Sequence, residues 1–149
     1  MITLTYTIDI NKPADTVFAT LTNKSVYPKW AKAWGDGMTY VGEWKEGTHM
    51  SFLDNSQGGT KVLFEVLEPN TYIKAKHVAM VNMDNEEIPL TDDMMKKWIG
   101  SLEEYRFRKT SANSTSLEIK MTVDKVFKPM FNTSWPKALQ YFKEVCEEE

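Results

Sequence analysis

The end of the chain carries an apolar stripe at helical spacing, and this stripe constrains the fold more than any other feature. In the segment FNTSWPKALQYFKEVCEEE the apolar side chains recur every three or four residues: Trp135, Ala138, Leu139, Phe142, Val145 and Cys146. A membrane, a partner helix or the chain's own sheet could cover this face. At roughly 1.5 Å per residue, a helix of about 17 residues spans about 25 Å, which matches a curved sheet of several strands. We therefore expect a helix that begins near Pro129 or Asn132 and packs on the chain's own sheet.

The rest of the chain supplies the strands of such a sheet. Short runs of β-forming residues alternate with turn residues, and strands linked in this way pair antiparallel and need a cover on one face. We expect an α+β helix-grip fold, in which a curved antiparallel sheet of about six to seven strands wraps around the long C-terminal helix. The expected strands are residues 2–10, 38–44, 48–54, 60–68, 71–81, 102–110 and 115–124.

Two short helices are expected between the first and second strands. Pro13 suits a first helical turn, and the residues after it form an apolar stripe: Ala14, Val17, Phe18 and Leu21. Pro28 interrupts any continuation of this helix, so a second short helical piece or an ordered loop follows. Trp30 and Trp34 beside that proline either line an entrance to a cavity or anchor the short helices.

The long connection from residue 82 to residue 101 is expected to hold one short helix. Thr91 is a suitable N-cap, and Gly100 follows the helix. Its apolar stripe is Met94, Met95, Trp98 and Ile99. This stripe either forms an adaptable lid over a cavity or docks the helix on the sheet.

Composition excludes several classes of function. The chain has 149 residues, which predicts a single domain over residues 1–149, and its formal net charge is −3 with scattered Lys and Arg. This charge pattern argues against nucleic acid as a partner. No stretch approaches the roughly 18 apolar residues of a membrane helix, so we expect no membrane partner.

The few cysteines and histidines carry further expectations. One cysteine, Cys146, allows no intramolecular disulfide, and residues 1–10 lack the basic and apolar regions of a secretory leader, which together predict a cytoplasmic protein. Two histidines far apart and one cysteine do not form a metal-binding pattern. We expect neither a metal nor another cofactor.

His77 is the first candidate for chemistry. It follows Ile73 and Ala75 in a run of alternating apolar residues, so its side chain is expected to point inward. A buried imidazole can act as a general acid or base. The alternative is a hydrogen-bonded histidine of the core or of a sheet edge.

Glu103 is the second candidate, because it shares the parity of Tyr105 on the same strand. An unpaired buried carboxylate is costly. Three readings follow: Glu103 pairs with a basic group such as Lys76 or Arg106, lies at the solvated end of its strand, or is a functional acid.

Several local stretches resemble one family. They are IDINKPADTVFATLTNKSVYPKW, VGEWKEGTHMSF, KVLFEVLEPN and SWPKALQYFKEV. With the order of the elements, they make the chain similar to the START-like, or SRPBCC, helix-grip superfamily. The branch resembled is that of homologues of the activator of heat-shock protein 90 ATPase, long grouped with polyketide cyclase-like proteins.

The resemblance implies a cavity between the sheet and the last helix, in which many family members bind small apolar molecules. It also implies which side chains point inward: Met50, Phe52, Tyr105, Phe107, Leu117, Ile119, Met121 and Val123 from strands, and Phe131, Trp135, Leu139 and Phe142 from the helix. The candidate ligand-binding residues are Met50, Phe52, His77, Trp98, Glu103, Tyr105, Phe107, Ile119, Met121, Phe131, Trp135, Leu139 and Phe142. The family has no catalytic signature, so no catalytic residue is transferred.

Three hypotheses of function follow. The first is a protein, monomeric or weakly dimeric, that binds a small apolar molecule in the cavity. The second is an interaction module that resembles the chaperone activators and acts on a chaperone ATPase through its surface. The third is a cofactor-free enzyme of cyclase or dehydratase type, with Tyr105, His77 or Glu103 as acid or base.

Overall fold

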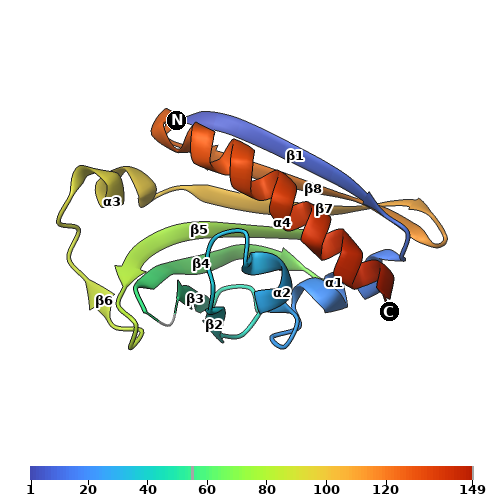
Figure 1. Cartoon of the computed structure of the whole chain (residues 1–149), viewed down its shortest axis with the longest axis horizontal. Coiled ribbons are helices and arrows are strands. Elements are labelled where there is room, and N and C mark those ends of the chain that lie inside the picture. Colours follow the sequence, from blue (N-terminus) through green and yellow to red (C-terminus); the bar gives the residue numbers. More distant parts are fainter. Residues whose placement is uncertain (55, 149) are drawn as a thin grey trace.

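The computed structural model describes residues 1–54 and 56–148, and it consists of one curved sheet gripping one long helix (Figure 1). The strands of this part of the chain are β1 (Ile2–Ile10), β2 (Met38–Gly42), β3 (His49–Asp54), β4 (Gly58–Glu68), β5 (Tyr72–Val81), β6 (Glu87–Ile88), β7 (Leu102–Ser111) and β8 (Ser114–Val123). The helices are α1 (Ala14–Leu21), α2 (Tyr27–Ala31), α3 (Asp93–Trp98) and α4 (Lys128–Glu148), with a 3-10 turn at Lys125–Phe127 before α4.

The sheet is antiparallel throughout, in the order β1-β8-β7-β5-β4-β3-β2, with the two-residue β6 paired to β5. The alternating segment at the N-terminus forms β1, which pairs along its whole length with β8, from Ile2 opposite Val123 to Ile10 opposite Thr115. Together with the long C-terminal helix, this sheet confirms the fold class expected from the sequence.

Helix α4 crosses one face of the sheet, with α1 and α2 packed beside it (Figure 1). Its apolar stripe is buried as expected, including Ala138, Leu139, Phe142 and Cys146. The helix begins at Lys128, next to the expected start at Pro129, and contains Pro136, which donates no helical hydrogen bond. The stripe at the end of the chain is therefore covered by the chain's own sheet and short helices. No helix in residues 1–54 and 56–148 is both long enough and apolar enough to cross a membrane.

Two details of the long connection differ from the sequence expectation. The N-cap of α3 is Asp92, whose carboxylate accepts the amide of Met95 at 2.8 Å, whereas the hydroxyl of Thr91 lies 3.7 Å from the sulfur of Met95. The expected cap at Thr91 was therefore wrong by one residue. Thr and Asp are both favoured at the N-cap, so the sequence does not distinguish Thr91 from Asp92. The short strand β6 was also missed, since two residues are too few to show alternation.

Candidate functional site

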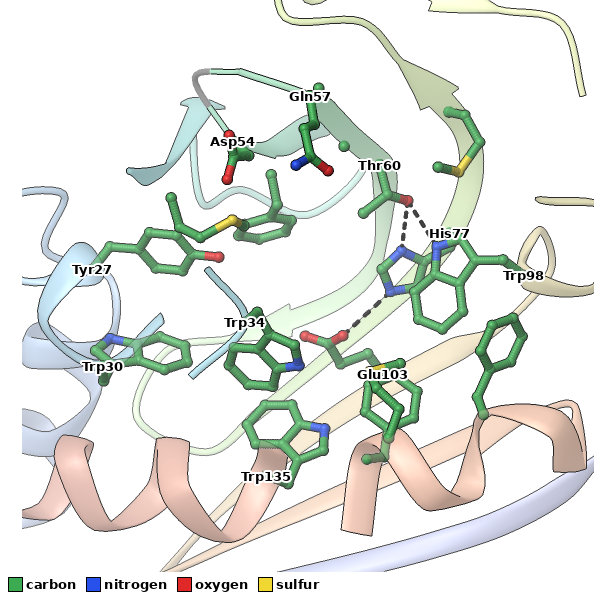
Figure 2. A pocket seen from close by; sticks show the side chains of 18 of the residues that line it. Tyr27, Trp30, Trp34, Asp54, Gln57, Thr60, His77, Trp98, Glu103 and Trp135 are labelled. Atoms are coloured by element: carbon green, nitrogen blue, oxygen red, sulfur yellow. Dashed lines mark hydrogen bonds and ion pairs between the residues drawn. The ribbon is translucent and has the colours of Figure 1, made fainter. Parts of the chain in front are cut away.

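A cavity of about 360 Å³ lies between the sheet, α2, α3 and the first half of α4 (Figure 2). Aromatic rings form most of its wall, including four of the chain's five tryptophans: Trp30, Trp34, Trp98 and Trp135. Tyr27, Phe52, Tyr105, Phe127 and Phe131 add further rings. The mouth is marked by Gln57 and Met130, which line the cavity and are exposed to solvent. This is an aromatic site that is open to solvent on one side.

The tryptophans hold one another in place. The rings of Trp34 and Trp135 meet edge to face, with centroids 4.7 Å apart, and Trp34 also packs edge to face against Trp30 at 6.2 Å. At the other end, Trp98 stacks on Phe131 at 5.7 Å. Such contacts add about 0.5–1.5 kcal/mol each beyond the burial of area. The rings of the wall therefore support one another directly.

One side of the cavity carries a chain of hydrogen bonds (Figure 2). The indole N–H of Trp98 donates to Oγ1 of Thr60 at 3.1 Å, and this oxygen lies 2.9 Å from Nδ1 of His77. Nε2 of His77 lies 3.3 Å from Oε1 of Glu103, and the hydroxyl of Tyr105 donates to Oε2 of the same carboxylate. Side chains from α3, β4, β5 and β7 thus meet in a single network.

The directions of these bonds fit a neutral imidazole. Because Thr60 accepts from Trp98, its own hydroxyl hydrogen is free to donate to Nδ1 of His77. The imidazole proton then sits on Nε2 and is donated to Glu103. In the protonated alternative Nδ1 donates to Thr60, whose hydroxyl can turn to the carbonyl of Ala79 at 3.4 Å. Each arrangement of the ring hydrogens gives both nitrogens of His77 a hydrogen-bond partner.

Glu103, rather than His77, presents its charge to the cavity. The His77 side chain is 3% exposed, whereas that of Glu103 is 16% exposed, and both line the cavity. Figure 2 shows the Glu103 carboxylate pointing toward His77, with Trp34 and Trp135 drawn on its other side. The Glu103 carboxylate is therefore the more accessible member of this pair, and His77 lies behind it.

Of the three readings of Glu103, a pairing with Lys76 or Arg106 is wrong. Its hydrogen-bond partners are His77 and Tyr105. Strand β7 places Glu103 opposite Ala75, two residues before His77 and on the same face, whereas Lys76 pairs with Leu102. Arg106 lies on the other face, where its side chain approaches Glu118 and the ring of Tyr72.

Two buried tyrosines face the same carboxylate. Burial raises the pKa of Tyr105 well above its usual value, and the negative charge and hydrogen bond of Glu103 raise it further. Burial, followed by the charge of Glu103, also raises the pKa of Tyr27. Both phenols therefore stay protonated and act as neutral polar groups in the wall.

The sequence-derived candidates divide into two groups. Those that line the cavity are Phe52, His77, Trp98, Glu103, Tyr105, Phe131 and Trp135. Those that pack in the core without lining it are Met50, Phe107, Ile119, Met121, Leu139 and Phe142. The short helices account for this division, since Phe18 of α1 packs on Phe107 at 5.6 Å and Trp30 of α2 packs on Phe142 at 5.6 Å. The cavity thus occupies only the part of the sheet that α1 and α2 leave uncovered.

Several lining residues were missed by sequence reasoning. Thr60 is the most informative, because it shares the parity of Val62 and Phe64 on β4 and could have been placed on the inner face. Trp30 and Trp34 line the cavity and pack with the rings around them, as their anchoring role requires, whereas the mouth lies at Gln57 and Met130. The others, scattered over helices, loops and strand ends, are Tyr27, Met38, Asp54, Gln57, Gly58, Gly59, Met80, Phe127 and Met130.

Not every polar atom near the cavity is available to a ligand. The indole N–H groups of Trp30 and Trp135 have no acceptor among the described residues, but they are also sealed from solvent. They therefore do not face the open volume. Over the same residues, no three His, Cys, Asp or Glu side chains come close enough together to hold a metal ion.

Solved structures share this fold although no protein-family model matches the chain and no curated protein matches its sequence significantly. Protein MLL2253 from Mesorhizobium loti is 12% identical, with a TM-score of 0.78 over 99% of this chain and 98% of its own. The Aha1 dimer from Colwellia psychrerythraea is 19% identical, with a TM-score of 0.72 over 99% and 97%. CalU16 from Micromonospora echinospora is 17% identical, with a TM-score of 0.65 over 96% and 73%. These similarities confirm the helix-grip fold that the sequence resemblance implied.

Proposed function

We propose that this chain is a START-like binding protein that takes a small, largely apolar, aromatic-sized molecule into the cavity beside α4. The observation that supports this proposal most strongly is the cavity itself, with about 360 Å³ of space behind a wall of aromatic rings. Ligand pockets typically measure about 300–1,000 Å³ and are mostly apolar with a few polar groups. The shared fold with CalU16 and the Aha1 dimer is consistent with this proposal at the level of the fold.

Native mass spectrometry of the freshly purified protein tests the proposal first, because a retained small molecule would add a fixed mass. Tryptophan fluorescence provides the second test, since four of the five tryptophans line the cavity. A naphthalene-sized probe should change that fluorescence with saturation at one equivalent. Absence of both a retained molecule and a saturable probe would refute the binding function.

A matched pair of variants locates the binding. Met130 and Met94 are both exposed methionines on helices, 42% and 47% exposed, but only Met130 lines the cavity. Met130→Trp should obstruct the mouth and weaken probe binding several-fold in isothermal titration calorimetry. Met94→Trp should leave the affinity unchanged, and equal effects of the two variants would place the binding site elsewhere.

A second candidate function is cofactor-free proton transfer, and the pairing of His77 with Glu103 inside the cavity favours it. Glu103 would take a proton from a carbon next to a ligand carbonyl, while His77 holds the carboxylate in place. Incubation with 2-tetralone in D₂O, followed by NMR, should then show faster loss of the protons next to the carbonyl than in buffer. Glu103→Gln should abolish this acceleration and Glu104→Gln should not; equal exchange in wild type and in buffer refutes this candidate.

The interaction-module hypothesis stays a prediction. It is supported by the sequence resemblance to chaperone activators and by the fold shared with the Aha1 dimer. Capture of a chaperone ATPase by the immobilised protein, with a rise in its ATPase rate, would support it. Light scattering after size exclusion would separate monomer from weak dimer.

A further inference from the structure

The charges that line the cavity are acidic. Of the described lining residues, Asp54 and Glu103 are carboxylic acids and none is Lys or Arg, although the chain contains 18 basic residues. Hydrogen bonds from Ser56 lower the pKa of Asp54 and keep it ionised near the mouth. His77 is the other ionisable group of this wall besides the tyrosines, and it faces Glu103. An anionic ligand would therefore meet two carboxylates and no exposed cation.

The aromatic rings of the wall also favour a positively charged ligand. The faces of Trp, Tyr and Phe rings carry partial negative charge and attract cations, by about 0.5–2 kcal/mol per contact depending on solvation. Trp34, Trp135 and Phe52 contribute rings to the same cavity as the Glu103 carboxylate. Proteins commonly use several aromatic rings to bind organic ammonium groups.

Glu103 also retains capacity for a further donor. A carboxylate offers about four acceptor positions, and His77 and Tyr105 occupy one on each oxygen. Any ligand that fills the cavity removes water from this carboxylate. A neutral apolar ligand would leave the charge poorly solvated, at a cost in binding free energy, whereas an ammonium group would replace the lost water with a charge-assisted hydrogen bond.

We infer that the ligand class of this cavity is an organic cation, a protonated amine with an aromatic or alicyclic body, whose ammonium group binds Glu103 while the body packs among the rings. This inference rests on the proposed binding function and adds the charge of the ligand to it. Asp54 places a second negative charge near the mouth of the cavity, through which the ligand would enter.

Three probes of nearly equal shape test the inference by calorimetry at neutral pH: 2-(aminomethyl)naphthalene, 2-(hydroxymethyl)naphthalene and 2-naphthoate. The amine should bind at least tenfold more tightly than the alcohol, and the carboxylate most weakly. If the alcohol or the carboxylate binds as tightly as the amine, the inference is wrong and the binding function stands. If none of the three binds, both are wrong.

The chain offers a matched control for the role of Glu103. Glu104, the next residue on β7, also accepts a tyrosine hydroxyl, from Tyr72, but it is not among the residues that line the cavity. Glu103→Gln should lower the amine's affinity to that of the alcohol, whereas Glu104→Gln should preserve the preference for the amine. Unchanged binding of the alcohol shows that Glu103→Gln has kept the cavity intact. A preference for the amine that survives Glu103→Gln would overturn the inference.

Discussion

Alanine variants at Phe142 and Phe52 should affect different properties, the first mainly the stability of the fold and the second mainly ligand binding. Both were expected to line the cavity, but Phe142 is 1% exposed and packs on Trp30, whereas Phe52 lines the cavity and is only half-buried. Replacement of Phe142 with alanine should therefore destabilise the protein without changing the ligand site. Replacement of Phe52 should mainly weaken ligand binding, with a smaller loss of stability.

The expected magnitudes follow from burial. Loss of a fully buried phenylalanine ring costs about 3–5 kcal/mol, since the transfer free energy is lost and a cavity remains. For a domain of this size, the fall in Tm should be roughly 10 °C or more. Phe52→Ala should cost roughly 1–2 kcal/mol, because part of its ring already faces open space. It should nevertheless weaken binding of a naphthalene-sized probe about tenfold, while Phe142→Ala leaves the affinity within about twofold.

Urea denaturation gives the free energy of unfolding of each variant, and calorimetric titration of the folded variants gives the affinity. The reasoning would be refuted if Phe142→Ala lost less than about 1 kcal/mol of stability and weakened binding as much as Phe52→Ala. That result would mean that the cavity extends along the second half of α4. Equal m-values in wild type and variants would confirm that the native and denatured states are comparable.

Three further predictions concern other parts of the structure. A Cβ added at Gly59 would lie 1.9 Å from the backbone oxygen of Phe52, so Gly59→Ala should force β3 and β4 apart. The free energy of unfolding measured in urea should fall by about 1–3 kcal/mol or more. An unchanged free energy of unfolding would contradict this strand pairing. Asp92→Ala should remove the N-cap of α3, which should cost about 1 kcal/mol of stability and speed hydrogen exchange of the amides of α3. Thr91→Ala should have neither effect. A larger loss of stability in Thr91→Ala than in Asp92→Ala would support Thr91 as the N-cap instead. Because the pKa of Tyr105 is raised, the folded state keeps the phenol proton above pH 10, where the unfolded state loses it. The free energy of unfolding should therefore fall as the pH rises above about 10, by at most about 1.4 kcal/mol per pH unit. Tyr105→Phe should make that fall shallower in denaturation curves between pH 9 and pH 11, and an unchanged slope would contradict the burial of the phenol.

Much of the fold could be predicted because its signals are local. The period of two in residues 2–10 and the helical stripe of α4 each depend on one segment only, and both elements form where they were expected. The cavity residues Phe131 and Trp135 were found for the same reason, since they lie on the inner face of that helix.

The pairing inside the site could not be predicted, because it depends on the register between strands. His77 and Glu103 are 26 residues apart, and only the alignment of β5 with β7 brings their side chains together. For a related reason, two residues of the second half of α4 were wrongly expected to line the cavity. Leu139 and Phe142 have the same helical phase as Trp135, and whether they meet open space or protein depends on how α2 places Trp30 against the helix.

Along α4, Phe131 and Trp135 border the cavity, whereas Leu139, Phe142 and Cys146 are packed in the core. Selection for a new ligand can therefore act on the first half of this helix while the second half continues to be selected for folding. Mutations in the two halves should couple mainly through α2 and the loop after it, because Trp30 packs on Phe142 and on Trp34, and Trp34 packs on Trp135. Such a chain can change its binding preference over evolutionary time without first losing its stability.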